Sequence, residues 1–309
     1  MTECIIGIDG GGTKTLLQAA DRNGTLLCQT TDGPSNLCSG SEEDVRLHLK
    51  QLWEKAIRFA PLAPQAVCLG TAGISAPNAP ERLGNMLREI TGCANVRVLG
   101  DMEIPLEVYS PNEDSMLLIS GTGSICYARS HTGAQTRSGG FGHLLGDEGS
   151  GYWIASEALK IVCRQLDAAV PKPGLLAKLL LSRIGASDCQ GIIGFVYRTP
   201  FDKSRIAALA PAVLEAAQQG DWQANEILTH AARNLFDLTK NTWKKAGLSA
   251  SDCRIFLNGG ILFHFRPVAE ELARLWHNYD PSVQLIRLRG TAADGALCLA
   301  RRAAGFPEI

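Results

Sequence analysis

The chain of 309 residues is long enough for two domains, each with a sizeable hydrophobic core. Its composition, 45% hydrophobic and 20% charged, is typical of a globular protein. The formal net charge is −1, so no general basic surface is expected for nucleic acid or an anionic membrane. No apolar run is long enough to span a membrane, and residues 1–12 lack the pattern of a signal peptide.

Ten cysteines are spread along the chain without a C-x-x-C pair, which argues against a zinc ribbon or a local iron–sulfur cluster. In a chain that is not exported, cysteines of this kind are typically reduced and buried. We therefore expect a cytoplasmic protein.

The N-terminal stretch Cys4–Thr15 joins a short apolar run to three glycines and two threonines. The β-branched run predicts a buried strand that stops at Asp9. Because Gly10–Gly12 lack a Cβ atom, the turn can adopt positive φ and present its backbone N–H groups to an anion. Thr13 and Thr15 would add hydroxyl donors, and Asp9 a carboxylate for a hard cation. These features favour phosphate binding, with a plain glycine hairpin as the alternative.

The remainder of the first half predicts two more strands, which complete an antiparallel meander, and then helices alternating with strands. Ser41–Asp44 resembles a helix start. Asp101 follows a strand and a glycine, which is where α/β sheets expose residues to ligands. The strands are expected at Thr15–Ala20, Thr25–Thr31, Ala66–Gly70 and Val96–Leu99, and the helices at Val45–Phe59, Pro80–Ile90 and Ile104–Tyr109.

The second half repeats this opening. The apolar run Met116–Ile119 leads into a glycine–hydroxyl turn at Ser120–Ser124, and a loop at Gly139–Gly151 is dense in glycine. The other expected strands are Ile125–Arg129, Ala134–Ser138, Arg254–Leu257 and Val283–Leu288. The expected helices are Tyr152–Leu166, Pro171–Gly185, Ala186–Val196, Ser204–Gln219, Trp222–Lys245, Arg266–His277 and Ala292–Ala304.

The internal repeat predicts two lobes, residues 1–115 and 116–309, with the closing helix 292–304 able to pack back on the first lobe. Each lobe would carry one glycine–hydroxyl turn, and the two turns would face each other across a cleft. A polyphosphate held between two such turns is the simplest ligand for that arrangement.

The same motifs resemble the actin-like ATPase superfamily and, within it, the N-acetylglucosamine kinase-like branch that includes the BadF/BadG/BcrA/BcrD ATPases. The matching segments run in order along nearly the whole chain: Asp9–Thr15, Gly100–Asp101, Ser120–Ser124, Gly139–Ala155 and Asn258–Gly260. Of these, Gly139–Ala155 is the most specific. The resemblance implies an α/β fold of two actin-like (ribonuclease H-like) lobes, each a mixed five-stranded sheet flanked by helices.

This resemblance also implies an activity, the transfer of the γ-phosphoryl group of ATP, with Mg²⁺, to the 6-hydroxyl of an amino sugar. Asp101 matches the catalytic base, and Asp9 the carboxylate that orients Mg²⁺. The positions that match ATP contacts are Gly11, Gly12, Thr13, Lys14, Gly121, Thr122, Gly123, Ala217, Gly259 and Gly260. The positions that match sugar contacts are Asn36, Asp101, Ser124, Gly140, Phe141, Gly142 and Asp147. Relatives in this branch are commonly dimers, so a homodimer is expected.

Structural roles stay open for several of these residues. Asp101 and Asp147 each precede a predicted helix and are suitable helix caps, and Asn36 is also a good turn residue. Lys14 lies outside any G-x-x-x-x-G-K-[ST] P-loop, which favours a solvated side chain over a phosphate clamp. Phe141 stands where close relatives often carry Trp, and this difference removes an indole N–H and some stacking area.

Other functions also fit parts of the pattern. N-acetylglucosamine is the favoured acceptor, with glucosamine and N-acetylmuramate as alternatives. An ATPase activator of the BadF type would use the same nucleotide turns, but the cysteines are not clustered and the Gly139–Gly151 loop favours a kinase. An actin- or chaperone-like scaffold is disfavoured because the chain has no room for a substrate-binding appendage or filament insertions.

Overall fold

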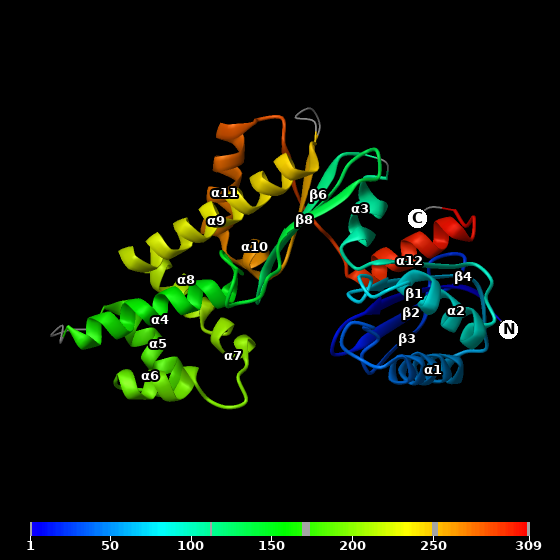
Figure 1. The fold of residues 1–309 in the computed structure, drawn as a ribbon, viewed down its shortest axis with the longest axis horizontal. Helices are drawn as coiled ribbons and strands as arrows, with labels where there is room; N and C mark the ends of the chain where they lie inside the picture. Colours follow the sequence, from blue (N-terminus) through cyan, green and yellow to red (C-terminus); the bar gives the residue numbers. More distant parts are fainter. Residues whose placement is uncertain (1, 112, 169–173, 249–252, 308–309) are drawn as a thin grey trace. The chain divides into compact units, whose positions relative to one another are not determined.

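The computed structural model describes residues 2–111, 113–168, 174–248 and 253–307. The chain forms two compact units (Figure 1). Unit 1 comprises residues 1–111 and 289–309, and unit 2 comprises residues 112–288. The C-terminal residues thus belong to the first unit, which is the arrangement that we allowed for the closing helix.

Unit 1 is built on a five-stranded mixed sheet in the order β3-β2-β1-β4-β5. β1 to β3 form the expected antiparallel meander, and β4 and β5 run parallel to β1. The strands are β1 (Thr2–Gly10), β2 (Thr15–Ala20), β3 (Leu26–Asp32), β4 (Leu62–Thr71) and β5 (Val96–Gly100). The helices are α1 (Glu42–Phe59), α2 (Ala79–Thr91), α3 (Glu103–Tyr109) and α12 (Ala292–Ala303).

The central strand β1 is buried on both faces, which explains its continuous apolar sequence. Cys4, Ile6 and Ile8 pack toward α1 and α2, while Ile5 packs toward α3 and α12. Gly7 lies directly under α12, because a Cβ atom there would collide with the helix backbone. Figure 1 shows α12, in red, beside this sheet.

Unit 2 repeats the topology, with a five-stranded sheet in the order β10-β9-β6-β7-β8. β6 to β8 are antiparallel, whereas β9 and β10 run parallel to β6. The strands are β6 (Ser115–Ser120), β7 (Ser124–Arg129), β8 (Gln135–Gly139), β9 (Arg254–Asn258) and β10 (Gln284–Arg287). Matching strand orders confirm the internal repeat that the sequence predicts.

The second unit carries most of the helices: α4 (Gly151–Asp167), α5 (Leu175–Ile184), α6 (Cys189–Val196), α7 (Lys203–Ala207), α8 (Ala210–Gln218), α9 (Trp222–Ala246), α10 (Gly260–His264) and α11 (Arg266–Tyr279). The single helix expected at Ser204–Gln219 is wrong, because α7 ends before α8 begins. Pro211 lies in the first turn of α8. Proline has no backbone N–H and its ring clashes with the carbonyl of residue i−4, so a continuous helix through this point is unfavourable.

The remaining expected strands and helices are confirmed, with ends shifted by a few residues; residues 171–173 lie outside the described residues. All ten cysteines are free thiols. Within the described ranges, no single helix is long and apolar enough to cross a membrane, although the pair α5 and α6, bent by 54°, passes such a test on length and composition.

Candidate functional site

Two aspartates lie at the carboxyl ends of the parallel strands of unit 1. Asp9 is the penultimate residue of β1, and Asp101 follows β5 directly. The ends of these strands are in register, because Gly10 pairs with Thr71 and Thr71 with Gly100. The backbone N–H of Asp101 donates to the carbonyl of Thr71 at 3.2 Å. The sheet therefore places both carboxylates at one edge, where ligands of α/β proteins bind.

Both carboxyl groups are partly buried, and burial raises the pKa of each above its ordinary value. The pKa of Asp9 is raised further by the negative charge of Asp101, an effect that Lys14 partly offsets. Asp101 Oδ1 accepts a hydrogen bond from the N–H of Met102 at 2.9 Å. Met102, rather than Asp101, is the N-cap residue of α3, so the capping role considered for Asp101 is not found.

The first glycine turn joins β1 to β2. Gly11 donates its N–H to the carbonyl of Lys14 at 3.0 Å, and the side chains of Thr13 and Lys14 are exposed. Thr15 was expected to offer a hydroxyl to phosphate, but this expectation is wrong. Thr15 is fully buried, and its hydroxyl donates to the carbonyl of Gly33 at 2.8 Å and is hydrogen-bonded with the hydroxyl of Ser35 at 2.9 Å.

Asn36 lies next to this turn. A Cβ atom added to Gly12 would come within 3.8 Å of Asn36 Nδ2, and one added to Gly73 within 2.6 Å of Asn36 Oδ1. Asn36 Oδ1 also accepts from the N–H of Cys38 at 2.7 Å. Asn36 is thus both the turn residue that we considered and a neighbour of the proposed phosphate turn, with its amide nitrogen directed toward Gly12.

In unit 2 the second glycine turn borders a cavity of about 570 Å³. Gly121 and Thr122 contribute one wall, and Gly260 contributes another. The remaining wall comes from helices α7, α8 and α10, through Ser204, Ala207, Ala208, Ala210, Pro211, Leu214, Ile261, His264 and Phe265, together with Gly151. Three residues predicted to contact ATP are therefore brought to one concave, largely apolar site of the size that holds small ligands.

The backbone next to Gly260 requires glycine at position 259. The φ of Gly259 is 101°, and a Cβ atom would collide with the carbonyl oxygen of Ser120. Ala217, by contrast, is 7% exposed and packs into the core of unit 2 from α8. Pro211 and Leu214, earlier on the same helix, line the cavity in its place. The nucleotide contact expected for Ala217 stays a prediction.

The Gly139–Gly151 loop wraps around the second glycine turn. Gly140 donates its N–H to the carbonyl of Ser124 at 3.1 Å, and Ser124 donates its hydroxyl to the carbonyl of Glu148 at 2.8 Å. Gly140 and Gly142 both have positive φ, and the Phe141 side chain between them is 62% exposed. The loop thus presents an aromatic ring to solvent from a backbone that only glycine adopts easily.

Asp147 occupies the inside of this loop. It is 3% exposed, and its carboxylate accepts from the N–H of Ser124 and pairs with Lys203. Ser150, rather than Asp147, caps α4 by accepting from the N–H of Trp153 at 3.2 Å. Lys203 was not predicted from the sequence, because it lies 56 residues from its partner and no local pattern marks it.

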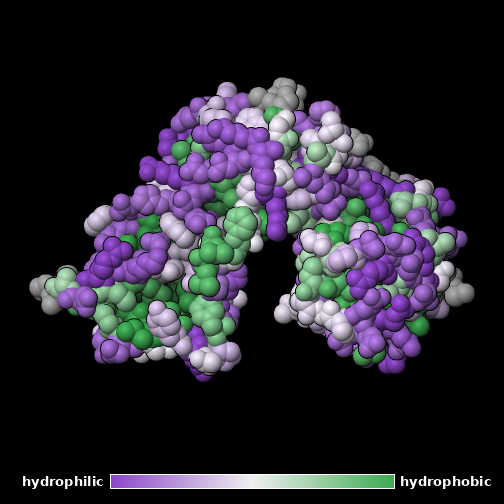
Figure 2. Space-filling model, viewed as in Figure 1, coloured by the Kyte–Doolittle hydropathy of each residue, from purple (hydrophilic) through white to green (hydrophobic). Residues whose placement is uncertain are grey.

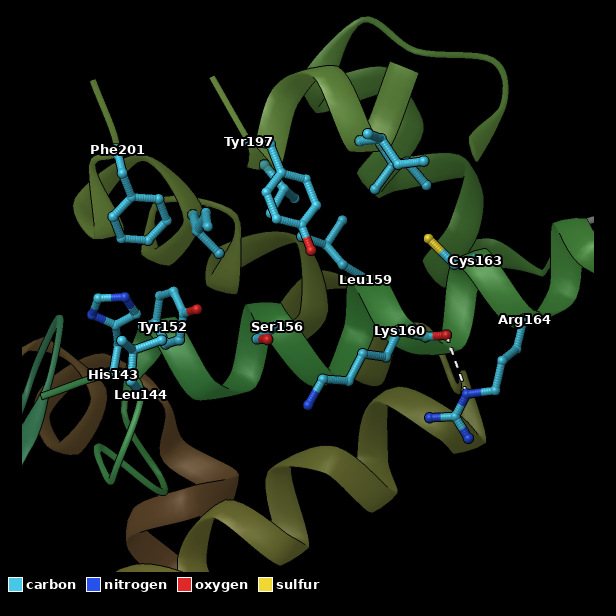
Figure 3. Close-up of a pocket in the computed structure, with 14 residues that line it drawn as sticks. His143, Leu144, Tyr152, Ser156, Leu159, Lys160, Cys163, Arg164, Tyr197 and Phe201 are labelled. Carbon is cyan, nitrogen blue, oxygen red and sulfur yellow. Dashed lines mark hydrogen bonds between the residues drawn. The ribbon is translucent and has the colours of Figure 1, made fainter. Parts of the chain in front are cut away.

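A second cavity of about 1010 Å³ opens beside the same loop (Figure 3). His143 stacks on Phe201 with ring centroids 4.7 Å apart and meets Tyr152 edge-on at 5.1 Å. Figure 2 shows hydrophobic side chains reaching the surface over the helices around it. Of the residues that line this cavity, Tyr197 is 77% exposed and Ile193 45% exposed.

Comparison with known proteins agrees with this architecture. A curated relative, the N-acetylmuramic acid/N-acetylglucosamine kinase of Clostridium acetobutylicum, is 31% identical over 96% of this chain and 98% of its own length. The N-acetyl-D-glucosamine kinase of Dictyostelium discoideum is 30% identical over 96% of this chain and 98% of its own length.

Among solved structures, a candidate N-acetylglucosamine kinase from Chromobacterium violaceum superimposes with a TM-score of 0.69 at 26% identity, covering 97% of this chain and 99% of that one. A ROK family glucokinase from Streptomyces griseus shares the fold alone, with a TM-score of 0.57 at 18% identity over 98% of this chain and 99% of that one. The sequence profile of the BadF/BadG/BcrA/BcrD ATPases matches residues 6–283. The chain therefore belongs to the BadF/BadG/BcrA/BcrD ATPase family.

Proposed function

We propose that this protein is a kinase that transfers the γ-phosphoryl group of ATP to the 6-hydroxyl of an amino sugar, with N-acetylglucosamine as the acceptor. The observation that carries the proposal is the identity of 31% and 30%, over 96% of the chain, with two proteins named as N-acetylglucosamine kinases. Such identity over the whole chain favours a shared reaction more strongly than a shared fold does.

Asp101 is the proposed general base. In the reaction, the 6-hydroxyl oxygen forms a bond to the γ-phosphorus, the bond from that phosphorus to the ADP oxygen breaks, and the hydroxyl proton passes to the Asp101 carboxylate. The raised pKa of Asp101 suits this role, because a base is most effective when its pKa lies near the working pH. Asn36 and Asp147, with Ser124 and residues 140–142, are proposed to contact the sugar.

The ATP phosphates are proposed to bind the two glycine turns, at residues 11–14 and 121–123, and the nucleoside to bind beside Gly259 and Gly260. The cavity of about 570 Å³ along Thr122 and Gly260 supports the proposed position of the nucleoside. Backbone N–H groups in such turns suit a polyphosphate, since phosphoryl transfer requires mainly positioning and charge neutralisation.

Asp9 would hold Mg²⁺. Its partly buried carboxylate makes no hydrogen bond with any residue that the structure describes, and hard cations prefer carboxylate oxygens. When bound, Mg²⁺ neutralises charge on the transferred phosphoryl group. Asp9 itself is held by the sheet on both sides, since it pairs with Leu16 of β2 and Gly70 of β4.

The test is an ADP-release assay with N-acetylglucosamine, glucosamine and N-acetylmuramate as acceptors. Turnover that depends on N-acetylglucosamine supports the proposal. Turnover with N-acetylmuramate as well would match the double name of the Clostridium relative. ATP hydrolysis that no sugar stimulates would refute the kinase assignment and favour an ATPase activator.

A homodimer and a cytoplasmic location complete the proposal. The exposed apolar side chains of Ile193, Tyr197 and Phe201 support self-association through unit 2, because large exposed apolar patches mark interaction surfaces. Ten free thiols are typical of a protein in a reducing compartment. Light scattering coupled to size-exclusion chromatography measures the mass of the particle in solution. The mass of a single chain at micromolar concentration would contradict the homodimer.

A further inference from the structure

Asp147 combines a buried carboxylate with an unusual backbone conformation. Its residue is 3% exposed and its φ is 65°. Residues other than glycine seldom adopt this left-handed backbone conformation, although aspartate tolerates it better than most. A buried charge is costly unless it is paired and hydrogen-bonded. Such a residue persists only where the surroundings hold it firmly, and this pattern is common at functional sites.

Two donors hold the carboxylate, one on each oxygen. The N–H of Ser124 donates to Oδ1 at 3.0 Å, and Lys203 Nζ donates to Oδ2 at 3.2 Å. The turn approaches so closely that a Cβ atom on Gly123 would lie 2.6 Å from Oδ1. Each carboxylate oxygen accepts about two hydrogen bonds, so both oxygens keep capacity for a ligand hydroxyl.

Lys203 reaches Asp147 from the first position of α7. Asp202 caps this helix by accepting from the N–H of Ser204 at 2.8 Å. The Lys203 side chain is 38% exposed, whereas that of Asp147 is 4% exposed, so the lysine approaches the carboxylate from the solvent side. On the same short helix, Ser204 and Ala207 line the cavity assigned to the nucleotide.

We propose that Lys203 is a positioning residue for the acceptor sugar, acting by fixing the orientation of the Asp147 carboxylate. The inference rests on the proposed kinase function, in which Asp147 contacts the sugar. The last torsion of an aspartate side chain has a broad, shallow preference, so one hydrogen bond from Ser124 leaves the carboxylate free to rock. The second donor, Lys203, removes that freedom and fixes the orientation of the carboxylate plane.

The test compares the kinetics of Lys203→Met, Lys203→Arg and the wild type. Methionine keeps an unbranched stem but removes the ammonium group, while arginine keeps the charge. We expect Lys203→Met to raise KM for N-acetylglucosamine about tenfold, the scale of one charged hydrogen bond, with KM for ATP changed by less than about threefold. Lys203→Arg should recover part of the loss. Lys160→Met is the matched control, because Lys160 pairs with Glu157 on the exposed face of α4.

A double-mutant cycle separates positioning from a general structural effect. If Lys203 acts through Asp147, adding Lys203→Met to Asp147→Asn should change sugar KM by less than about twofold. The double variant also avoids a buried unpaired charge and thus serves if Lys203→Met alone does not fold. An unchanged sugar KM in a folded Lys203→Met protein, or effects that multiply in the double variant, would overturn the inference.

Titration calorimetry with N-acetylglucosamine gives a readout that is independent of turnover. Weaker sugar binding by Lys203→Met, with Lys160→Met unchanged, supports the inference. If the wild type neither binds nor phosphorylates any amino sugar, the proposed function is wrong and the role of Lys203 falls with it. If the wild type is active and Lys203→Met matches it, only the role of Lys203 is wrong.

Discussion

Replacing Asp101 with asparagine separates catalysis from folding. Asparagine keeps the Oδ1 atom that accepts from the N–H of Met102, and the backbone bond from Asp101 to Thr71 does not involve the side chain. The fold should therefore be retained. The variant loses the general base, which contributes about 10²- to 10⁴-fold to rate, so kcat should fall by at least about 10²-fold.

The same variant should be more stable than the wild type at neutral pH. Burial raises the pKa of Asp101, so the folded state binds this proton more tightly than the unfolded state. The ionised carboxylate therefore lowers the free energy of unfolding above the folded pKa, and this penalty disappears as pH falls through the folded pKa toward the unfolded value. Asn carries no charge at any pH, so its advantage in melting temperature should be present at pH 7.5 and vanish near pH 3.

Asp32→Asn is the matched control for both measurements. Burial alone would raise the pKa of Asp32, but Lys55, at 2.6 Å, and the N–H of Gly33 lower it below its ordinary value. Its contribution to stability is thus present above the unfolded pKa and lost as pH falls, so Asp32→Asn should melt earlier than the wild type at pH 7.5 and keep its kcat. If Asp101→Asn retains kcat within about tenfold in the ADP-release assay, Asp101 is not the base.

Two further predictions concern the edges of the site. Gly259→Ala should lower the free energy of unfolding by about 2 kcal/mol and raise KM for ATP, because alanine is strained at a φ of 101° and its Cβ would collide with Ser120; a melting temperature equal to that of the wild type would contradict this. With a thiol reagent, the exposed Cys38 should react first and the buried Cys126, whose pKa burial raises to about 12, only after unfolding. N-acetylglucosamine should slow the reaction of Cys38, because the backbone N–H of Cys38 donates to Oδ1 of Asn36, a proposed sugar contact. Equal reaction rates with and without the sugar would count against that contact.

The elements with strong local signals could be predicted from the sequence. The apolar run of β1 and the Ser41 cap of α1 are examples, and the structure shows Ser41 accepting from the N–H of Asp44 at 3.1 Å. The break between α7 and α8 also had a local signal, in Pro211, but the small apolar residues around it gave a helical period that dominated the interpretation.

Some site residues were assigned wrongly or missed in the sequence because their roles depend on tertiary contacts. Thr15 sits in a glycine–hydroxyl turn like a phosphate ligand, yet its hydroxyl secures a loop that returns only after β3. The pairing of Lys203 with Asp147 joins an α7 residue to a loop that precedes α4. Neither spacing has a period that a strand or helix would impose, so only the folded chain reveals these contacts.

The shared edge of Asp9 and Asp101 has a consequence that can be measured without turnover. Burial is the main cause of the raised pKa of Asp9, and the negative charge of Asp101 is the next. Asp101→Asn removes the second cause and leaves the first. The pKa of Asp9 should therefore fall but remain above its ordinary value of 3.8.

Carbon-13 NMR of protein labelled at aspartate carboxyl carbons follows this titration, with the signal assigned by its loss in Asp9→Asn. Asp32→Asn provides the control, because it removes a carboxylate of the same unit whose charge is not among the causes that shift the pKa of Asp9. An Asp9 pKa that is the same in the wild type and in Asp101→Asn would mean that the two carboxylates do not interact. The proposal that Asp9 holds the metal and Asp101 accepts the proton, side by side at one sheet edge, would then lose its electrostatic basis.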